Sequence, residues 1–202
     1  MARRDHSLDP VIVKAARAEF LEHGFQKASL HKIAERGGIT TGALYTRYLN
    51  KDDLFLSLVE PVLEELAAKG APIRSLYEAV RKTPSAEALL QAIRAEEQIY
   101  LQLLFDHYED CILIFCRSDG SSLQKQSQQM MEGKSAQTVA FFRSIARQEL
   151  DYDGIAMIMS QQFYYYRQIL QQGFCREKAV SCMETVEVFL EAGCTALFQK
   201  IL

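Results

Sequence analysis

The stretch GGITTGALYTRYLNKDD, residues 37–53, decides the fold of this chain. It places a glycine pair, a threonine pair and a third glycine between segments whose apolar residues recur at helical spacing. A helix that only filled a core would not carry so many glycines at its start. The pattern therefore predicts a short helix whose first turn is approached closely by something outside the core.

Three short helices are expected around this stretch. Their bounds follow from capping residues and from glycines that end a helix. The first begins at Asp9 and Pro10 and stops at Gly24, the second runs from Ser29 to the glycine pair, and the third, capped by Thr40, runs from Thr41 to about Tyr48. Two short helices joined by a glycine turn are typical of a helix-turn-helix.

The rest of the chain is also expected to be helical, because almost no segment alternates with a period of two. A fourth helix is capped by Asn50 and is expected to kink at Pro61, whose ring removes one backbone hydrogen bond. The segments KGAPIRS (69–75) and RKTPSAE (81–87) are expected to be loops. Further helices are predicted at 85–105, 108–116, 121–148, 153–172 and 177–201. The predicted fold class is all-α, with about nine helices.

The charge of the chain is unevenly distributed. Residues 1–51 hold 9 Lys+Arg and 5 Asp+Glu, a net charge of +4, whereas the remainder holds 14 and 21, a net charge of −7. A basic first segment on an acidic body suits a small module that meets phosphate.

Composition also bears on the compartment. No apolar run is long enough to span a membrane, and the first ten residues lack the apolar core of a signal peptide. The five cysteines are odd in number and widely spaced, which argues against a secreted disulfide framework. We therefore expect a cytoplasmic protein with reduced thiols, no membrane partner and no cofactor.

A helix-turn-helix explains the glycines of the opening stretch. Its second helix enters the major groove of DNA, so the early residues of that helix approach bases and phosphates closely. Gly38 is expected to turn the chain through a left-handed conformation, and Gly42 leaves out a side chain that would meet the DNA backbone. Thr40 and Thr41 offer hydroxyls and backbone N–H groups to phosphate.

The order of these residues resembles the DNA-binding domain of the TetR family of bacterial transcription regulators. The resemblance covers residues 10–58 and rests on IAERGGITTGALYTRYLNKDDL (33–54) and VIVKAARAEFLEHGFQKASL (11–30). Two places depart from the common pattern, with Gly37 where alanine is usual and Arg47–Tyr48 where His-Phe is common. The resemblance implies a helix-turn-helix domain at 1–52 and a helical ligand-sensing and dimerisation domain at 53–202.

Residue by residue, the resemblance implies two sets of contacts with double-stranded DNA. The sugar-phosphate backbone would be bound by Ser29, Thr40, Tyr45, Arg47 and Lys51, with Gly42 close to it. Base edges would be near Lys32, Thr41, Ala43 and Thr46. Leu44 and Tyr48 are expected to face the core instead.

The body of the chain is expected to form a homodimer and to bind a small-molecule effector. By resemblance, the last two helices pair with their copies in a second subunit, and a dimer would read an inverted-repeat operator as a repressor released by the effector. Candidates for the lining of the effector pocket are aromatic or polar: Tyr100, Leu104, His107, Tyr108, Cys111, Phe141, Phe163 and Tyr166.

Three alternatives are weighed beside this interpretation. His107 and Cys111 are four residues apart on a predicted helix, with Cys116 nearby, a spacing that suits a metal sensor. Cys175 and Cys182, close to basic residues, would suit a redox switch. An enzyme would have to rest on the body alone, because no nucleotide loop, nucleophile elbow or dense His/Asp/Glu cluster is present in the sequence.

Overall fold

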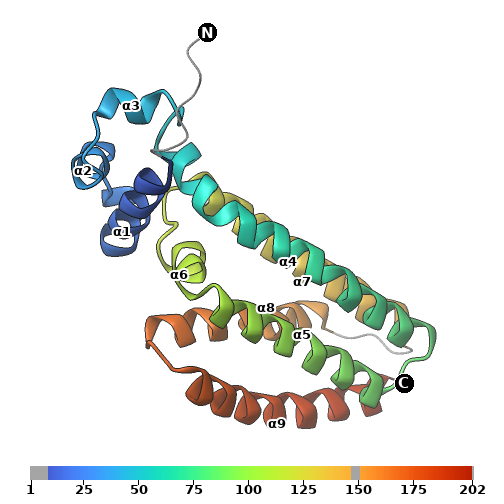
Figure 1. Ribbon diagram of the computed structural model, residues 1–202. Helices are drawn as coiled ribbons and strands as arrows, with labels where there is room; N and C mark the ends of the chain where they lie inside the picture. Colours follow the sequence, from blue (N-terminus) through green and yellow to red (C-terminus); the bar gives the residue numbers. More distant parts are fainter. Residues whose placement is uncertain (1–8, 147–150, 202) are drawn as a thin grey trace. The chain divides into compact units, whose positions relative to one another are not determined.

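The computed structural model of the chain describes residues 9–146 and 151–201, and these form nine helices without a strand. Figure 1 labels them α1 to α9. Their bounds are α1 Asp9–Lys27, α2 Leu30–Arg36, α3 Thr41–Tyr45, α4 Lys51–Lys82, α5 Ala86–Asp106, α6 Tyr108–Cys116, α7 Ser122–Ile145, α8 Tyr152–Gln171 and α9 Arg176–Ile201. The all-α prediction is confirmed.

The helices gather into two compact units. Unit 1 consists of Met1–Leu63 and Glu109–Ser127, and unit 2 consists of Glu64–Tyr108 and Gln128–Leu202. Helices α4 and α7 contribute residues to both units. The helix-turn-helix lies wholly in unit 1.

Unit 1 is built around three phenylalanine rings. Phe20 meets Phe55 edge to face at 5.0 Å between ring centroids, and Phe25 meets Phe55 in the same way at 5.3 Å. The edge of one ring carries positive charge and the face of the next carries negative charge, so this geometry is favourable. The remaining large buried side chains of the unit include Ile12, Ile33, Leu44, Leu54, Leu113 and Leu123.

The segment around α6 also belongs to unit 1, which the sequence did not reveal. Arg17 of α1 forms an ion pair and hydrogen bond with Asp110 of α6. The N–H of Phe25 donates to the Arg117 carbonyl at 2.8 Å. Asp52, at the start of α4, accepts a hydrogen bond of 2.8 Å from the N–H of Ser122. Helix α6 and the start of α7 are therefore tied to α1 and to the start of α4.

Unit 2 has a separate core contributed by four helices. Its buried members are Val80 from α4, Leu89 and Ala92 from α5, Phe142 and Ile145 from α7, and Ile155 from α8. Helix α9 packs against α5 within the same unit.

The largest correction concerns α4. Residues 69–75 were expected to form a loop, but α4 is one uninterrupted helix from Lys51 to Lys82 (Figure 1). Gly70 and Pro72 weaken a helix, yet Ile73 and Val80 on the same helix are buried. Burial of an apolar face outweighs local propensity here. The kink at Pro61 stays a prediction, although the helix plainly continues beyond it.

The third helix is also shorter than expected. It ends at Tyr45. In a longer helix the Ala43 carbonyl would accept a hydrogen bond from the backbone N–H of Arg47, but here it accepts from two side chains. The Thr46 hydroxyl and the Arg47 guanidinium both donate to the Ala43 carbonyl, at 2.7 and 3.1 Å. The Arg47 N–H donates instead to Leu44, three residues back, at 3.0 Å.

The other helix bounds agree closely with the predictions. Ser85 caps α5 through a 3.1 Å hydrogen bond from the N–H of Ala88, and Asn50 accepts from the N–H of Asp53 at the start of α4. The predicted end of α7 at Gln148 lies outside the described residues. Among the described residues, no helix is long and apolar enough to cross a membrane.

Candidate DNA-binding surface

A glycine turn sets the direction of α3 relative to α2. Gly38 has a φ of 62°, the left-handed conformation that was predicted for it. Its N–H donates to the Glu35 carbonyl and the N–H of Ile39 donates to the Ala34 carbonyl, both at 3.0 Å. This pair of hydrogen bonds is the Schellman motif, which satisfies the last carbonyls of α2 and turns the chain sharply. Helix α3 can therefore begin only three residues later.

Helix α3 is held at its start by a cap and in its middle by the core. The Thr40 hydroxyl oxygen accepts a 3.1 Å hydrogen bond from the N–H of Ala43, as predicted. Leu44 is fully buried, whereas Tyr45 beside it is 54% exposed. One face of α3 is thus fixed against unit 1 and the other is presented to solvent.

The predicted DNA contacts fall into two groups by exposure. The exposed group is Lys32, Thr40, Gly42, Tyr45 and Thr46. The partly buried group is Ser29, Thr41, Ala43, Arg47 and Lys51. Most members of both groups lie on α3 or on the turns at its ends, so unit 1 brings them together.

Arg47 is engaged within unit 1. Its Nε donates to Asp9 at 2.8 Å, and only 10% of its side chain is exposed. This ion pair joins the residue after α3 to the first turn of α1. The expected phosphate contact of Arg47 would have to compete with the Asp9 carboxylate.

Lys51 is also engaged. Its Nζ donates to the carbonyls of Gln26 and Ala28, at 3.2 and 3.1 Å, and lies 4.6 Å from the centroid of the Phe25 ring. Partial burial lowers the pKa of Lys51. The ammonium group satisfies carbonyls at the end of α1, a structural task that the sequence interpretation had not assigned to it.

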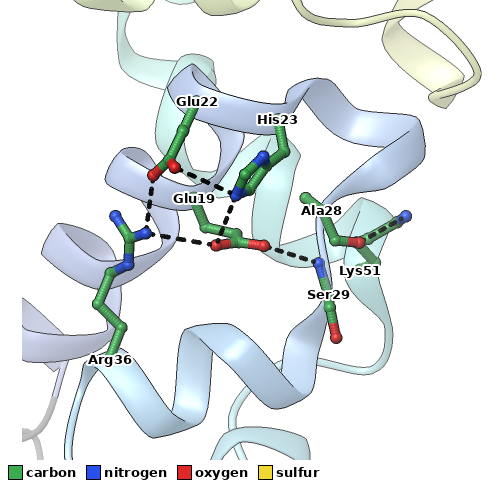
Figure 2. A network of polar contacts seen from close by, with 7 residues as sticks. All are labelled: Glu19, Glu22, His23, Ala28, Ser29, Arg36 and Lys51. Carbon is green, nitrogen blue, oxygen red and sulfur yellow. Dashed lines mark hydrogen bonds and ion pairs between the residues drawn. The ribbon is translucent and has the colours of Figure 1, made fainter.

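A buried carboxylate clamps α1 to α2 (Figure 2). Glu19 is fully buried and accepts a 3.2 Å hydrogen bond from the N–H of Ser29, whose own side chain makes no capping bond to α2. Its other oxygen lies 3.8 Å from His23 Nε2 and 3.7 Å from Arg36. Arg36 also bonds Glu22 at 2.8 Å, and this hydrogen bond lowers the pKa of Glu22. Ser29 therefore helps to join two helices.

The predicted effector residues are only partly brought together. Within unit 2, the Tyr100 and Tyr166 rings meet edge to face at 5.8 Å, while Leu104 is buried and Phe163 is partly buried. Phe141 contacts the ring of Tyr77 at 6.1 Å. Cys111 lies in unit 1, apart from this group in the division of the chain.

Two other predicted effector residues contact neighbouring side chains near the end of α5. His107 Nε2 lies 2.8 Å from the Glu65 carboxylate, and Tyr108 stacks on Phe105 with 6.1 Å between ring centroids. These contacts hold the end of unit 2 together.

The sequence missed a cluster of carboxylates in unit 2. Glu96 and Glu97 of α5 are 4% and 2% exposed. A signal was available, since each lies seven residues from a buried leucine on either side: Leu89 and Leu103 for Glu96, Leu90 and Leu104 for Glu97. At helical periodicity these are core positions.

The positions of His107 and the cysteines do not favour a metal sensor or a redox switch. His107 ends α5 with non-helical backbone angles and Cys111 belongs to α6, so the two do not share one helix. No group of three potential ligands gathers among the described residues. Cys175 and Cys182 are seven residues apart at the start of α9, about 10 Å at helical rise and too far for a disulfide within one subunit.

These elements form a helix-turn-helix in unit 1, and the described residues of unit 2 form helices and their connections. The family described as "Bacterial regulatory proteins, tetR family" matches residues 12–58. The match covers 47 of the 202 residues, so it shows this likeness for the part of the chain that holds the helix-turn-helix.

Two curated relatives match a part of the chain. The probable acrEF/envCD operon repressor of Escherichia coli K12 is 39% identical over 57 residues, which are 27% of this chain and 26% of that protein. The HTH-type transcriptional repressor Rv1474c of Mycobacterium tuberculosis is 34% identical over 67 residues, 33% of each chain. The matched segments thus span only about a quarter to a third of these relatives.

Solved structures resemble the chain over most of its length. The fatty acid degradation regulator FadR from Bacillus halodurans has a TM-score of 0.58 at 19% identity, covering 92% of this chain and 98% of that one. NalD, the secondary repressor of the MexAB-OprM multidrug efflux pump in Pseudomonas aeruginosa, has a TM-score of 0.56 at 19% identity, covering 89% and 94%. At this identity the likeness shows the fold alone.

Proposed function

We propose that the protein is a dimeric repressor of transcription that leaves its operator when a small molecule binds unit 2. The observation that carries the proposal is the outer face of α3, where Thr40, Gly42, Tyr45 and Thr46 are exposed beside the fully buried Leu44. A helix that is fixed on one side and polar on the other suits insertion into the major groove. The repressor names of the two curated relatives support the same function.

The proposed contacts follow the exposure of the side chains. Tyr45 and Thr40 hydroxyls donate to phosphate oxygens, and Lys32, Thr41, Ala43 and Thr46 lie near base edges. Ser29, Arg47 and Lys51 lie at the edge of the interface, where each also holds unit 1 together. Gly42 lets the DNA backbone approach α3.

A homodimer is supported by apolar side chains that unit 2 leaves exposed on its last two helices. Met157, Ile158 and Tyr164 of α8 are 68%, 54% and 55% exposed, and Val188 and Phe189 of α9 are 69% and 81% exposed. Large apolar groups gathered on a surface mark a protein contact. A second copy of α8 and α9 would cover them.

The test of DNA binding compares two exposed lysines of unit 1, measured by fluorescence anisotropy on the DNA that flanks the gene. Lys32→Ala is expected to weaken binding by about 1–3 kcal/mol, because Lys32 is placed near base edges. Lys125→Ala on α7 is the matched control and is expected to bind as the parent does. Equal affinities for the two variants would show that Lys32 of α2 does not contact the DNA. If the parent does not bind the DNA at low salt, the proposed function is wrong.

A further inference from the structure

The two buried glutamates in the middle of α5 have different surroundings. Removing an ionised carboxylate from water costs several kcal/mol unless hydrogen bonds or a positive charge replace the water. Glu96 obtains hydrogen bonds from tyrosines: the Tyr77 hydroxyl donates to it at 2.9 Å, and Tyr100, one turn along α5, also bonds it. Burial and the Glu96 charge raise the pKa of both tyrosines, so both remain donors.

Glu97 lacks such compensation. Its Oε2 is buried and has no hydrogen-bond partner. Its carboxyl group bonds the carboxyl group of Glu187 on α9, a contact that requires a proton between them. Burial, followed by the contact with Glu187, raises the pKa of Glu97 to about 8.

The nearest guanidinium does not neutralise this interior. Arg94 bonds Glu191 at 2.8 Å and lies 3.9 Å from Glu187, with 45% of its side chain exposed. Other titratable groups that act on the cluster include Tyr77 from α4, Tyr100 from α5 and the neutral buried thiol of Cys194 from α9. Glu97, Glu187 and Glu191 therefore share one partly exposed arginine, and Glu96 is bonded by tyrosines instead.

Aromatic rings complete the surroundings. The ring of Tyr100 meets that of Tyr166 at 5.8 Å, and the ring of Tyr77 bonds through its hydroxyl to Glu96. Ring faces carry negative charge and attract cations, while their area suits an apolar group. The cluster thus combines a buried carboxyl oxygen that has no hydrogen-bond partner with aromatic area.

We propose that the effector of unit 2 is a hydrophobic amine in its protonated form, whose ammonium group donates to Glu97 Oε2 while its apolar part packs on Tyr100 and Tyr166. The inference rests on the proposed function and names the chemical class of its effector. The incoming N–H supplies the donor that Oε2 lacks, and the positive charge takes the place of the proton held between Glu97 and Glu187. One cation enters and one proton leaves. An anion would be repelled by the ionised Glu96, and a neutral molecule carries no positive charge that could replace the proton.

The first experiment uses three molecules of the same size and different charge: 2-phenylethylamine, 2-phenylethanol and phenylacetate. Binding to the full chain is measured by isothermal titration calorimetry near neutral pH. Only the amine is expected to bind. Glu97→Gln is expected to lower its affinity at least tenfold, whereas Glu87→Gln, an exposed glutamate at the start of the same helix, is expected to leave it unchanged.

Equal binding of the neutral or anionic molecule, no binding of the amine, or full affinity in Glu97→Gln would overturn the proposal. A melting curve of each variant shows whether it is folded. The second variant, Glu97→Asp, keeps the carboxyl group on a shorter side chain and is expected to retain pH-dependent binding. The proposal can therefore still be tested if Glu97→Gln does not fold.

The proton exchange provides a second readout. Below the pKa of about 8, Glu97 is protonated in the free protein, so binding must release that proton. The affinity for 2-phenylethylamine should therefore rise toward about tenfold per pH unit from about pH 6 to 8 and then level off. A flat profile would contradict displacement of the proton. DNA binding without amine is measured separately by anisotropy, so failure of the amine site and failure of the repressor function are distinguishable.

Discussion

Several residues of unit 1 stabilise its fold and are also proposed to contact DNA. Thr40 is the cap of α3 and also a proposed phosphate ligand, while Lys51 donates to the carbonyls of Gln26 and Ala28 at the end of α1. We expect a variant at such a position to change both the stability of the fold and the affinity for DNA. The clearest tests therefore use positions where the structure leaves room.

Gly42 and Gly38 form such a pair. A Cβ on Gly42 would meet only Thr40 Oγ1, at 3.9 Å, so Gly42→Ala should keep the fold and even favour the helix by about 1 kcal/mol. Its DNA affinity should nevertheless fall, because the added methyl group meets the approaching DNA backbone. Gly38→Ala should show the opposite pattern, losing about 1–2 kcal/mol of stability because its φ is 62°. Urea melts and anisotropy separate the two effects; unchanged DNA affinity in Gly42→Ala would mean that the backbone does not approach there.

Lys51→Ala should produce two separate losses. Removing a phosphate contact should make log affinity less steep in log salt by about 0.9. Removing the hydrogen bonds to Gln26 and Ala28 should lower stability by about 1 kcal/mol. A salt series of anisotropy titrations measures the first and a urea melt the second. A stability loss with an unchanged salt slope would confine Lys51 to its structural task.

Sequence reasoning worked at this scale where local chemistry decides the conformation. Gly38, the Thr40 cap and the buried Leu44 follow from steric limits, hydrogen bonding and helical periodicity, and the structure confirms all three. Glu19 and Glu97 could not be placed in the same way. Charged residues are expected outside, and only the tertiary structure shows which partners let them occupy core positions.

Among the elements, α4 shows where local rules fail. Glycine and proline predicted a loop at residues 69–75, but the cost of each in a helix is a few kcal/mol at most and the buried face of the helix offsets it. The position of α6 was also beyond sequence reasoning, because Arg17 and Asp110 are 93 residues apart. Pairings over such a separation leave no periodic signal.

The prediction at the scale of the helices concerns Pro61 of α4. Pro61 is exposed in the continuous α4 and has no N–H to donate to the Ser57 carbonyl, so the helix is weakened at that point. Pro61→Ala should stiffen α4, keep the fold, and change the ratio of DNA affinities with and without effector more than it changes the melting temperature. Coupling of about 1–3 kcal/mol is enough for a 5- to 150-fold ratio. The same ratio in variant and parent would show that Pro61 takes no part in switching.

At the scale of the whole molecule, the question is what covers the apolar side chains of α8 and α9. The resemblance implies that the last two helices pair with their copies in a second subunit, and the structure leaves Phe189 of α9 81% exposed. A twofold dimer through these helices would give the protein two recognition helices, as an inverted repeat with half-sites about 34 to 36 Å apart requires. The structure of one subunit shows which apolar side chains of α8 and α9 are exposed. That a second subunit covers them remains a proposal.

Phe189→Glu tests this surface. In a twofold interface the change introduces two buried carboxylates, and desolvating them without partners should dissociate the dimer. Light scattering at micromolar concentration should give twice the chain mass of 23.0 kDa for the parent and the single chain mass for the variant. DNA affinity should fall with the loss of the second half-site, while the melting of each folded chain remains cooperative. Leu49→Glu is the matched control, since Leu49 is 84% exposed in the other unit and should leave the dimer mass unchanged. A parent that is monomeric with and without DNA, or a Phe189→Glu variant that stays dimeric, would show that this face is not the dimer interface.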